Sequence, residues 1–467
     1  MNKIPTIGPS APLLSYIGAY QFLHNANEMI REGYMKYKGR AFKVAFFDRW
    51  MVVVSGHLIE EIGRLPDDQV SFQRGAQELL QSKWTLGRET TEDPYHIEVI
   101  KEKLTRNLAT VLPQVMDEIQ HAFDDQIPTK GDEWTEIHAL PVMTKIVARV
   151  VNRAFVGVPF CRDPTYLRLA SGMIGDVYKG RTLLNLVPFF LRPIVAHFWL
   201  PTNLTNQMMS DIMMPVIEER QRKLRELGDD WTDKPADVLM WILEEAEGKD
   251  SRLRTLIQML LVINFVALHS SSGGITHALY HLAAQPEYIE PLREEIELTI
   301  AAEGWTKTAL NKMWKLDSFM KESQRINGHN CTSLTRVTLK DVYFSDGTLV
   351  PAGTLLVAAT LATQSDDNLY PNAAEFDAFR FSKLREENDS IKYQYATTSP
   401  EFITFGHGKH ACPGRFFAVD ELKSIMAYIV LNYDVKFERE GVRPANKWIS
   451  TSVNPDPTAK VLFRRRK

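Results

Sequence analysis

A long apolar stretch between residues 251 and 284, which ends before Pro286, is the feature that most limits how this chain can fold. It has the length of a helix and is too apolar to lie on a protein surface, so it should run through the middle of the fold. Its longest apolar run, from Met259 to Leu268, is interrupted by Asn264 and is too short to cross a bilayer. The sequence therefore predicts a large protein built around one buried helix.

Composition and charge exclude several classes of protein. The 467 residues are 44% hydrophobic and 24% charged, which is ordinary for a globular protein and excludes disorder or a fibrous repeat. A net charge of −3 provides no surface for a polyanion, so no nucleic acid is expected as a partner. Three scattered cysteines, Cys161, Cys331 and Cys412, are too few for a disulfide framework and favour a reducing compartment.

The remaining patterns predict a mainly α fold with small β-sheets. Helical periodicity fits residues 15–37, most of 94–228, 313–326 and 414–432. Strand pairs fit residues 43–55 and 337–359, whereas residues 363–404 are expected to be rich in loops. Residues 1–14 are expected to form a proline-rich lead-in. Because the chain has no internal repeat and no long linker, residues 15–467 are expected to form one domain.

The sharpest local motif is a glycine-rich loop from Phe405 to Gly414 (FGHGKHACPG), which ends where a helix is predicted to begin. A thiolate at Cys412 gains stability from the positive end of the helix dipole and from the free amides of the first turn. The glycines let the backbone fold closely around the sulfur, and Pro413 suits a first helical position. The alternative is a buried, inert cysteine at a helix cap.

The spacing Phe-x-x-Gly-x-x-x-Cys-x-Gly in this loop resembles the haem-binding loop of cytochromes P450. The resemblance implies a haem b cofactor whose iron takes the thiolate of Cys412 as its axial metal ligand, with Phe405 in the same cofactor-binding loop. It also implies the fold, which is a single mainly α domain with small sheets. That domain should enclose the haem between the central helix and the helix that follows Cys412.

Two further motifs resemble the same family. Residues 322–325 (ESQR) are similar to its Glu-x-x-Arg motif, in which Glu322 and Arg325 would share one helix face. Arg380 is similar to the arginine that completes a buried Glu–Arg–Arg network in the family. The resemblance makes these three residues structural, because they would fix the cysteine loop beneath the haem. Taken alone, a Glu-x-x-Arg pair is usually a solvated surface salt bridge.

The two propionates of a haem need basic partners. His410, two residues before the cysteine, and Arg336, after the Glu-x-x-Arg helix, match positions where the family places such partners. The usual Trp-x-x-x-Arg motif is not evident. Ile97 and Lys101 fall nearest to it, which makes Lys101 a third candidate. Each of the three cations could instead be an ordinary surface residue.

In this family the central helix carries an Ala/Gly-Gly-x-Asp/Glu-Thr-Thr motif over the oxygen-binding face of the haem. Alignment of residues 278–283 (ALYHLA) places His269 where the acid usually stands and Ser270 where the threonine stands. An imidazole can relay protons near neutral pH, and Ser270 can donate a hydrogen bond to dioxygen, so both are candidate catalytic residues. The alternative is that His269 is a polar core residue in a weak helical patch.

By the same resemblance, the substrate pocket should be apolar. Its candidate walls are Phe72, Leu80, Trp84, Phe265, Leu268, Leu334 and Val453. Aromatic residues at such positions belong more often to the ordinary hydrophobic core, which is the alternative for this whole set.

The stretch from Leu183 to Leu200 has aromatic residues between prolines and falls in the family's loop between the two roof helices. An apolar patch there predicts contact with a membrane surface, and the alternative is burial against the roof. The first residues lack the apolar stretch of a signal peptide or anchor. The resemblance implies a full-length form on the cytoplasmic face of the endoplasmic reticulum membrane, and a soluble or peripherally associated chain as given.

The resemblance is closest to fungal microsomal monooxygenases, including diterpene-oxidase-like ones. It implies hydroxylation of a small apolar substrate (a terpenoid, steroid or aromatic compound) by O2. Electrons would come from NADPH through a separate cytochrome P450 reductase, since the chain has no Gly-rich dinucleotide loop. Its candidate docking residues are Lys101, Lys103, Arg106 and Lys409. The alternatives are a P450-fold enzyme that uses or rearranges peroxides, and a haem-binding sensor or carrier without chemistry.

Overall fold

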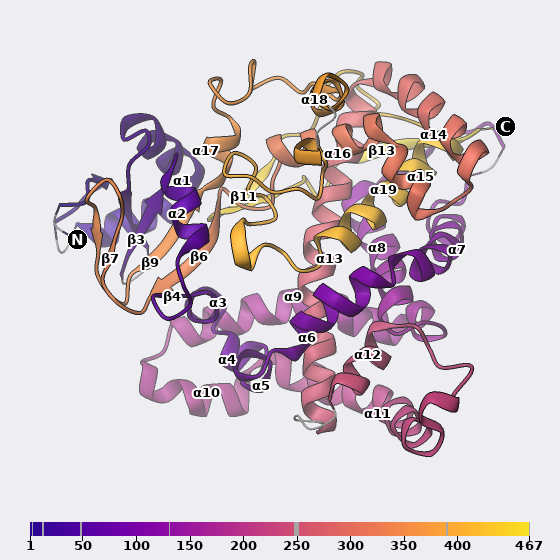
Figure 1. The fold of residues 1–467 in the computed structure, drawn as a ribbon, viewed down its shortest axis with the longest axis horizontal. Helices are drawn as coiled ribbons and strands as arrows, with labels where there is room; N and C mark the ends of the chain where they lie inside the picture. The colour runs from indigo at the N-terminus through magenta and orange to yellow at the C-terminus, as the bar shows by residue number, and fades with distance from the viewer. Residues whose placement is uncertain are drawn as a thin grey trace.

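Helix α13 (Leu253–Ala284) passes through the middle of the molecule (Figure 1). The structure is a computed structural model that describes residues 1, 3–11, 14–46, 49–129, 131–246, 252–388 and 391–466. Most side chains of α13 are buried, because α8 (Ala139–Phe155), α9 (Pro164–Asn185) and α11 (Pro201–Leu227) pack against it. The prediction of a buried central helix is confirmed. Within the described ranges, α13 is the one helix long and apolar enough to span a membrane, yet most of that apolar segment lies inside the protein, as in a core helix.

The fold is mainly helical with small sheets, as predicted. The other helices are α1 (Ser15–Lys36), α2 (Leu58–Arg64), α3 (Phe72–Leu80), α4 (Ser82–Thr85), α5 (Glu89–Glu92), α6 (Tyr95–Glu98), α7 (Leu108–Gln126), α10 (Arg192–Trp199), α12 (Val238–Glu245), α14 (Ile289–Glu303), α15 (Lys307–Lys312), α16 (Trp314–Ile326), α17 (Thr360–Gln364), α18 (Arg380–Asn388) and α19 (Arg415–Asn432). A π-helical turn, Val99–Leu104, follows α6.

A six-stranded sheet lies to one side of α13, at the left of Figure 1, with strand order β1-β2-β3-β9-β6-β4. Its strands are β1 (Thr6–Ile7), β2 (Phe42–Phe46), β3 (Arg49–Val54), β9 (Leu355–Ala359), β6 (Thr332–Thr338) and β4 (Val70–Ser71). Alternate residues of β3 and β9 enter two different cores, one shared with α1 and one shared with α2. Because both faces are covered, the strands are continuous apolar runs.

The strand pairing differs from the prediction in two parts of the chain. The predicted hairpin over residues 337–359 is antiparallel, but it divides into two ladders, β6 with β9 and the short β7 (Val342–Tyr343) with β8 (Leu349–Val350). The lead-in also contributes, because β1 pairs in parallel with β2. The prediction of loops over residues 363–404 was wrong for α18, which begins at Arg380.

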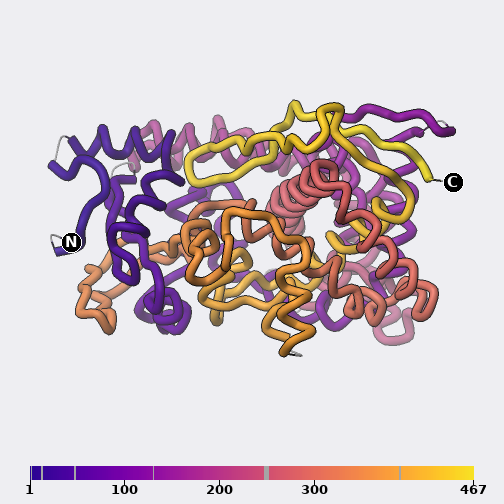
Figure 2. The backbone as a smooth tube through the Cα atoms, turned by 90° about the horizontal axis from the view of Figure 1, so that it is seen from above, coloured from indigo at the N-terminus to yellow at the C-terminus, as the bar shows by residue number. Residues whose placement is uncertain are grey.

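All but one of the remaining strands come from the C-terminal part of the chain. β10 (Tyr433–Lys436), β13 (Lys460–Arg465) and β5 (Thr135–His138) form a three-stranded sheet in the order β10-β13-β5. β11 (Lys447–Ile449) and β12 (Ser452–Asn454) form a hairpin that reaches across to α1 (Figure 2). This hairpin also hydrogen-bonds to the segment after α16, since the Val453 amide donates to the carbonyl of His329 at 2.9 Å.

Candidate functional site

The cysteine loop, defined here as residues 403–414, lies between α18 and α19 and is closed by its own backbone. The Cys412 amide donates a 2.7 Å hydrogen bond to the carbonyl of Phe405. Gly408 has φ +72°, and a Cβ at this position would overlap the backbone of Gly63 in α2. The predicted need for glycine is therefore met at Gly408 by both backbone conformation and close approach. The loop is pressed against the helix that precedes the β4 strand.

Three contacts between ionisable side chains hold the cysteine loop to the segment of α2 and the residues after it. His407 Nε2 lies 2.8 Å from a carboxylate oxygen of Glu60 in α2, and His410 Nε2 lies 2.6 Å from Asp67. Lys409 also contacts Asp67. The hydrogen bonds from Lys409 and His410 hold the pKa of the Asp67 carboxyl below its usual range. The carboxylates therefore stay charged and fix the loop to the sheet side of the molecule.

The sulfur of Cys412 lies where the cysteine loop turns into α19. Burial raises the pKa of the Cys412 thiol, whereas the amides of Gly414 and Arg415 and the charge of Arg415 act in the opposite direction. The predicted amide contacts are present. In the protein alone, their lowering effect on the pKa of Cys412 is smaller than the raising effect of burial. A partly buried sulfur with amide donors beside it would become a stable thiolate once it binds a cation.

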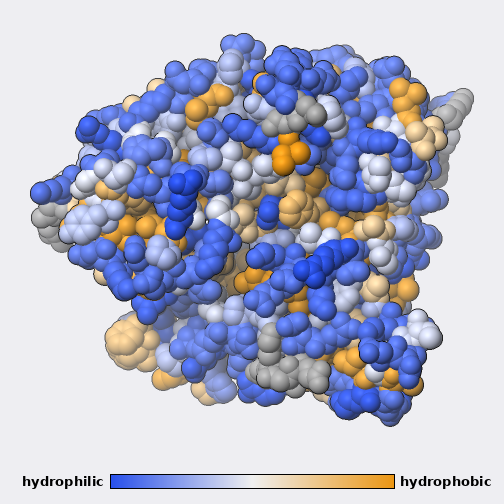
Figure 3. All heavy atoms as spheres, viewed as in Figure 1, coloured by the Kyte–Doolittle hydropathy of each residue, from blue (hydrophilic) through white to orange (hydrophobic). Residues whose placement is uncertain are grey.

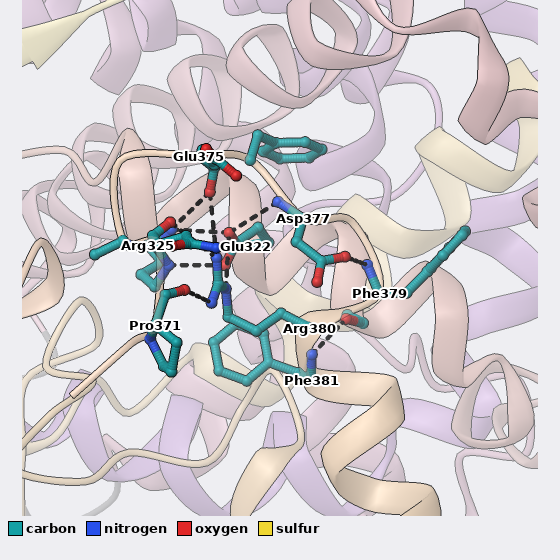
Figure 4. A network of polar contacts seen from close by, with 12 residues as sticks. Glu322, Arg325, Pro371, Glu375, Asp377, Phe379, Arg380 and Phe381 are labelled. Carbon is teal, nitrogen blue, oxygen red and sulfur yellow. Dashed lines mark hydrogen bonds and ion pairs between the residues drawn. The ribbon is translucent and has the colours of Figure 1, made fainter. Parts of the chain in front are cut away.

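Glu322, Arg325 and Arg380 meet in a buried ion-pair network, as the sequence suggested (Figure 4). Arg325 donates to both carboxylate oxygens of Glu322, at 2.7 and 2.8 Å, and Arg380 Nε donates to one of them at 3.1 Å. The side chains of Glu322 and Arg325 are 0% exposed, which separates this pair from a solvated surface salt bridge. The two arginines also bind main-chain carbonyls of residues 364–375, which leaves few of their donors unused.

Gln364, which the sequence analysis missed, connects this network to the cysteine loop. Its main-chain carbonyl accepts a 2.6 Å hydrogen bond from Arg325. Its side-chain oxygen accepts from the Ile403 amide at 3.2 Å and from the Thr404 hydroxyl at 3.0 Å. No local motif marks this glutamine, because its partners are about 40 positions away on either side in the chain.

Arg336 and His410, the two predicted propionate partners, both lie against the ring of Phe72. The Phe72 and His410 rings are stacked with centroids 6.1 Å apart, and the Arg336 guanidinium lies 5.6 Å from the Phe72 centroid. Burial lowers the pKa of Arg336 to about 10, although the Asp67 charge raises it. Phe72, predicted as a pocket wall, thus contacts both predicted propionate partners. Lys101 is exposed on the π-helical turn Val99–Leu104.

His96, in α6, is a second polar residue that the sequence analysis missed. It is buried, its Nδ1 has no hydrogen-bond partner among the described residues, and burial lowers the pKa of the imidazole to about 4. His96 directly precedes Ile97, in the segment where the Trp-x-x-x-Arg motif is lacking. This position was the only feature of the sequence that could have drawn attention to it. The turn that follows packs on the cysteine loop, with Ile100 beside Gly414.

The middle of α13 has one open face. Val266 is 54% exposed although its neighbours Phe265 and Leu268 are buried, and the Ser270 hydroxyl, one turn on, is exposed and donates to the Val266 carbonyl at 2.9 Å. The ring of His269 lies edge-on to Tyr178 of α9, with centroids 6.2 Å apart. Burial lowers the pKa of His269, which keeps the imidazole neutral. The sequence analysis did not name Val266. The signal for it was its position four residues before Ser270, which puts the two residues on one side of the helix.

The other predicted pocket residues are mostly packed. Leu334 and Val453 lie in the two cores of the large sheet, and Leu80 packs at the edge of the main helical core. Trp84 packs against Leu184 and Leu200 of the roof. Leu334 has φ +53°, next to an irregularity in the β6–β9 ladder. The core alternative therefore describes much of this set.

An apolar surface patch, named here the roof patch, covers α10 and the turn before it. Its exposed members are Leu186, Phe189, Phe190, Leu191, Ile194, Phe198, Trp199 and Leu204. Phe189 is 79% exposed and Phe198 is 68% exposed, so the alternative of burial against the roof is wrong for these rings. Figure 3 shows the hydrophobic atoms at the lower left, over the position of α10.

Comparison with known proteins covers nearly the whole chain. The family model described as Cytochrome P450 matches residues 5–463. Cytochrome P450 monooxygenase 103 of Postia placenta is 50% identical over 100% of this chain and 94% of its own length, and Cytochrome P450 monooxygenase CYP512U6 of Ganoderma lucidum is 41% identical over 100% and 92%. Ent-kaurene oxidase P450-4 of Gibberella fujikuroi is 31% identical over 99% and 93%. The chain belongs to the cytochrome P450 family, whose members are haem-iron enzymes, and its curated relatives are fungal monooxygenases.

Proposed function

We propose that this protein is a haem-thiolate monooxygenase in which Cys412 is the axial ligand of a haem b iron. The observation that carries the proposal is the position of Cys412. Its partly buried sulfur has the amides of Gly414 and Arg415 beside it and ends a loop that Gln364 ties to Arg325. A sulfur held in this way needs a cation as partner, and ferric iron in a porphyrin supplies one.

The polar groups around the loop fit a haem with two propionates. Arg336 is a buried guanidinium that donates a hydrogen bond to the Thr335 carbonyl, and His410 stacks on Phe72, which Arg336 also contacts. The Nδ1 of buried His96 has no partner among the described residues, and a buried nitrogen of this kind calls for one. We assign Arg336, His410 and His96 to the propionates. Lys101, exposed on its turn, is assigned to the surface instead.

When bound, the haem supplies activation of dioxygen for insertion of one oxygen atom into a C–H bond. The chain's own residues hold the sulfur, exclude water and position protons. Ser270 holds its proton at Oγ on the open face of α13, now bound to the Val266 carbonyl, and rotation about χ1 would turn that proton toward the site. His269 is neutral and can accept and donate a proton on its two ring nitrogens.

The substrate class follows from the lining of α13. The exposed Val266 beside Ser270 makes an apolar floor with one hydroxyl, which suits a small apolar molecule such as a terpenoid, a steroid or an aromatic compound. A diterpene is the class named for the relative from Gibberella fujikuroi, and the similarity over the full chain favours a terpenoid. Electrons would come from NADPH through cytochrome P450 reductase. Of its candidate docking residues, Arg106 pairs with Glu102 and Lys409 with Asp67.

The roof patch supports attachment to a membrane surface. Its aromatic rings project from α10 and the preceding turn with most of their area in solvent. Such an arrangement suits the interface of a bilayer, and a microsomal enzyme would hold it against the cytoplasmic face of the endoplasmic reticulum.

The test of the haem-thiolate assignment is spectroscopic. Protein expressed with a porphyrin supply should be coloured, and its reduced carbon monoxide adduct should have the red-shifted absorption of an anionic sulfur donor. The variant Cys412→Ser should lose that absorption, whereas Cys331→Ser, at a buried cysteine in another part of the fold, should retain it. Normal haem absorption without the thiolate signature would reject Cys412 as ligand, and a colourless pure protein would reject the function.

A further inference from the structure

The ammonium group of Lys321 is buried, although lysine is among the residues least often found inside a protein. Lys321 lies in α16 and is 2% exposed. Its Nζ donates a 2.9 Å hydrogen bond to the carbonyl of Gln394 and contacts the carbonyl of Lys392 at 3.5 Å. The same Nζ lies 4.7 Å from the ring centroid of Phe381 and 4.5 Å from that of Phe402. Carbonyl oxygens and ring faces both attract a cation, so these contacts offset part of the cost of burying the charge.

Three of these four groups belong to the approach segment, defined here as residues 391–402, which leads directly into the cysteine loop. Its last residue is Phe402. Tyr395, in the same segment, donates from its amide to Asp317 of α16 at 2.8 Å, and its ring packs on Phe405 of the loop with centroids 5.6 Å apart. Burial raises the pKa of the Tyr395 phenol, so this ring adds no charge. Helix α16 thus binds the approach segment through Asp317 and, one turn later, through the ammonium group.

This link is separate from the one through Gln364. Gln364 binds Ile403 and Thr404 at the start of the cysteine loop, whereas α16 binds residues that precede them. Within the approach segment, every residue of which the structure describes, the 3-10 turn Ile391–Tyr393 is the one element of regular structure. Segments with so few backbone hydrogen bonds of their own open locally at low cost. The position of the approach segment therefore depends on its contacts with α16.

Charged side chains from neighbouring elements act on the ammonium group. Burial lowers the pKa of Lys321 from 10.5 to about 7. The charge of Asp317 acts in the opposite direction, whereas the charges of Arg385 and Lys392 add to the effect of burial. The carboxylate of Asp317 is also shared, because Lys423 Nζ of α19 lies 3.0 Å from it and Arg385 Nη1 of α18 lies 3.5 Å from it. The protein thus holds several cations around this one carboxylate.

We propose that Lys321 is a positioning residue for the cysteine loop, and that it makes the attachment of that loop to α16 depend on pH. In the closed arrangement of this structure, the ammonium group binds the approach segment but is shielded from water. In a loosened arrangement it reaches solvent and regains the proton affinity of an ordinary lysine. The loosened arrangement binds the proton more strongly, so proton uptake favours it and rising pH favours the closed arrangement. The inference rests on the proposed haem-thiolate function.

The pH window is set by the pKa of Lys321 in each arrangement. Below about pH 7 the amine is charged in both arrangements, so their populations do not depend on its proton. Between about pH 7 and pH 10.5 only the loosened arrangement holds the proton. Each pH unit in this window should favour the closed arrangement by up to about tenfold. The cysteine loop should therefore be held most firmly on the alkaline side of neutral.

Hydrogen exchange of the approach segment tests this directly, without turnover. The measured quantity is the protection factor of residues 391–402, read by mass spectrometry between pH 7 and pH 9. It should rise at least about tenfold in the wild-type holoenzyme and stay level in Lys321→Met, whose flexible side chain packs against rings without a proton to lose. Lys145→Met, at an exposed lysine of α8, is the matched control and should keep the wild-type profile. A level profile in the wild-type protein would overturn the proposal even if Lys321→Met failed to fold.

The effect on the sulfur is read from the reduced carbon monoxide adduct. The measured quantity is the rate at which the thiolate-type absorption is lost at a fixed temperature, in the wild-type protein relative to Lys321→Met. This ratio should decrease at least about fivefold from pH 7 to pH 9, because the approach segment opens less often. A constant ratio alongside a changing protection factor would show that Lys321 holds the segment without positioning the cysteine, which also overturns the proposal.

Failure of this inference can be distinguished from failure of the proposed function. If the wild-type protein has the thiolate-type spectrum but either profile is level, the role of Lys321 is wrong and the monooxygenase stands. If the wild-type protein lacks that spectrum at every pH, the proposed function is wrong and the positioning role fails with it.

Discussion

Arg325 and Gln364 hydrogen-bond to each other in both directions. Arg325 donates from its guanidinium to the main-chain carbonyl of Gln364 at 2.6 Å, and the Gln364 amide donates back to the Arg325 carbonyl at 3.0 Å. The side-chain oxygen of Gln364 remains to accept from Ile403 and Thr404. The buried ion-pair network thus reaches the cysteine loop through one glutamine, which is 0% exposed.

Gln364→Leu should therefore loosen the cysteine loop without touching the sulfur. It leaves the Ile403 amide, the Thr404 hydroxyl and the Arg325 carbonyl without their present partner, and each buried unpaired group costs about 1–3 kcal/mol. The free energy of unfolding should fall by at least about 3 kcal/mol. The fraction of haem with thiolate ligation should also fall. Gln120→Leu, exposed on α7, should change neither quantity; equal loss in both variants would contradict the link.

Gly408→Ala should lower the free energy of unfolding by more than the cost of placing alanine in a left-handed backbone conformation. Gly408 and Gly441 have nearly the same φ, +72° and +73°, but only Gly408 lies against another backbone. At Gly441, alanine should cost about 1–2 kcal/mol, the usual penalty of a left-handed conformation. At Gly408, the added methyl group must also push the cysteine loop away from Gly63. This displacement should lower the free energy of unfolding by at least about 1 kcal/mol more. Chemical denaturation of the two variants, with haem content measured alongside, checks this difference.

Local sequence patterns predicted the features whose cause is local. Most of the apolar stretch of α13 and the valines of β3 are buried, and so the pattern alone specifies them. The prediction of loops failed at α18, because that helix is short and polar and owes its place to Arg380, which is bound to Glu322. Tertiary contact rather than local propensity decides such a segment.

The site residues also divide into those that a local pattern predicts and those that depend on contacts between distant segments. Cys412 and Glu322 belong to motifs with fixed spacing, which a single sequence can reveal. Gln364 acts through partners far away in the chain. Leu268, predicted as a pocket wall, is 0% exposed, whereas Val266 faces open space. Periodicity gives the helix but does not fix its rotation when nearly every residue is apolar.

Glu421→Gln should make stability less dependent on pH. Burial raises the pKa of Glu421 in α19 from 4.5 to about 8, although the Ser271 hydroxyl, which donates to it at 3.1 Å, acts the other way. In the folded protein the group stays protonated up to about pH 8, while in the unfolded chain it ionises above pH 4.5. The unfolded state therefore binds fewer protons in this window, so the free energy of unfolding falls as pH rises.

The measurement for Glu421 is the melting temperature between pH 5 and pH 8.5. The wild-type protein should lose stability toward pH 8 relative to Glu421→Gln, with an upper bound of about 4 kcal/mol at pH 7.5. Glu386→Gln, a substitution in α18, controls for a change of charge alone. Parallel pH curves for wild-type protein and Glu421→Gln would show that Glu421 is already ionised in the folded state.

The roof patch should bind membranes through Phe189 and Phe190, whose side chains are 79% and 64% exposed. Each phenylalanine that leaves water contributes about 1.5–3 kcal/mol, so the double variant Phe189→Ser, Phe190→Ser should bind vesicles at least about tenfold more weakly. Its melting temperature should not change, because the two rings contribute little to the folded core. Leu298→Ser is the matched control, since this leucine is 67% exposed on α14, far from α10 in Figure 1. Sedimentation with phosphatidylcholine vesicles measures the partition. If the control weakened binding as much as the double variant, attraction to the vesicle would be a general property of the surface, and the roof patch would not be its site.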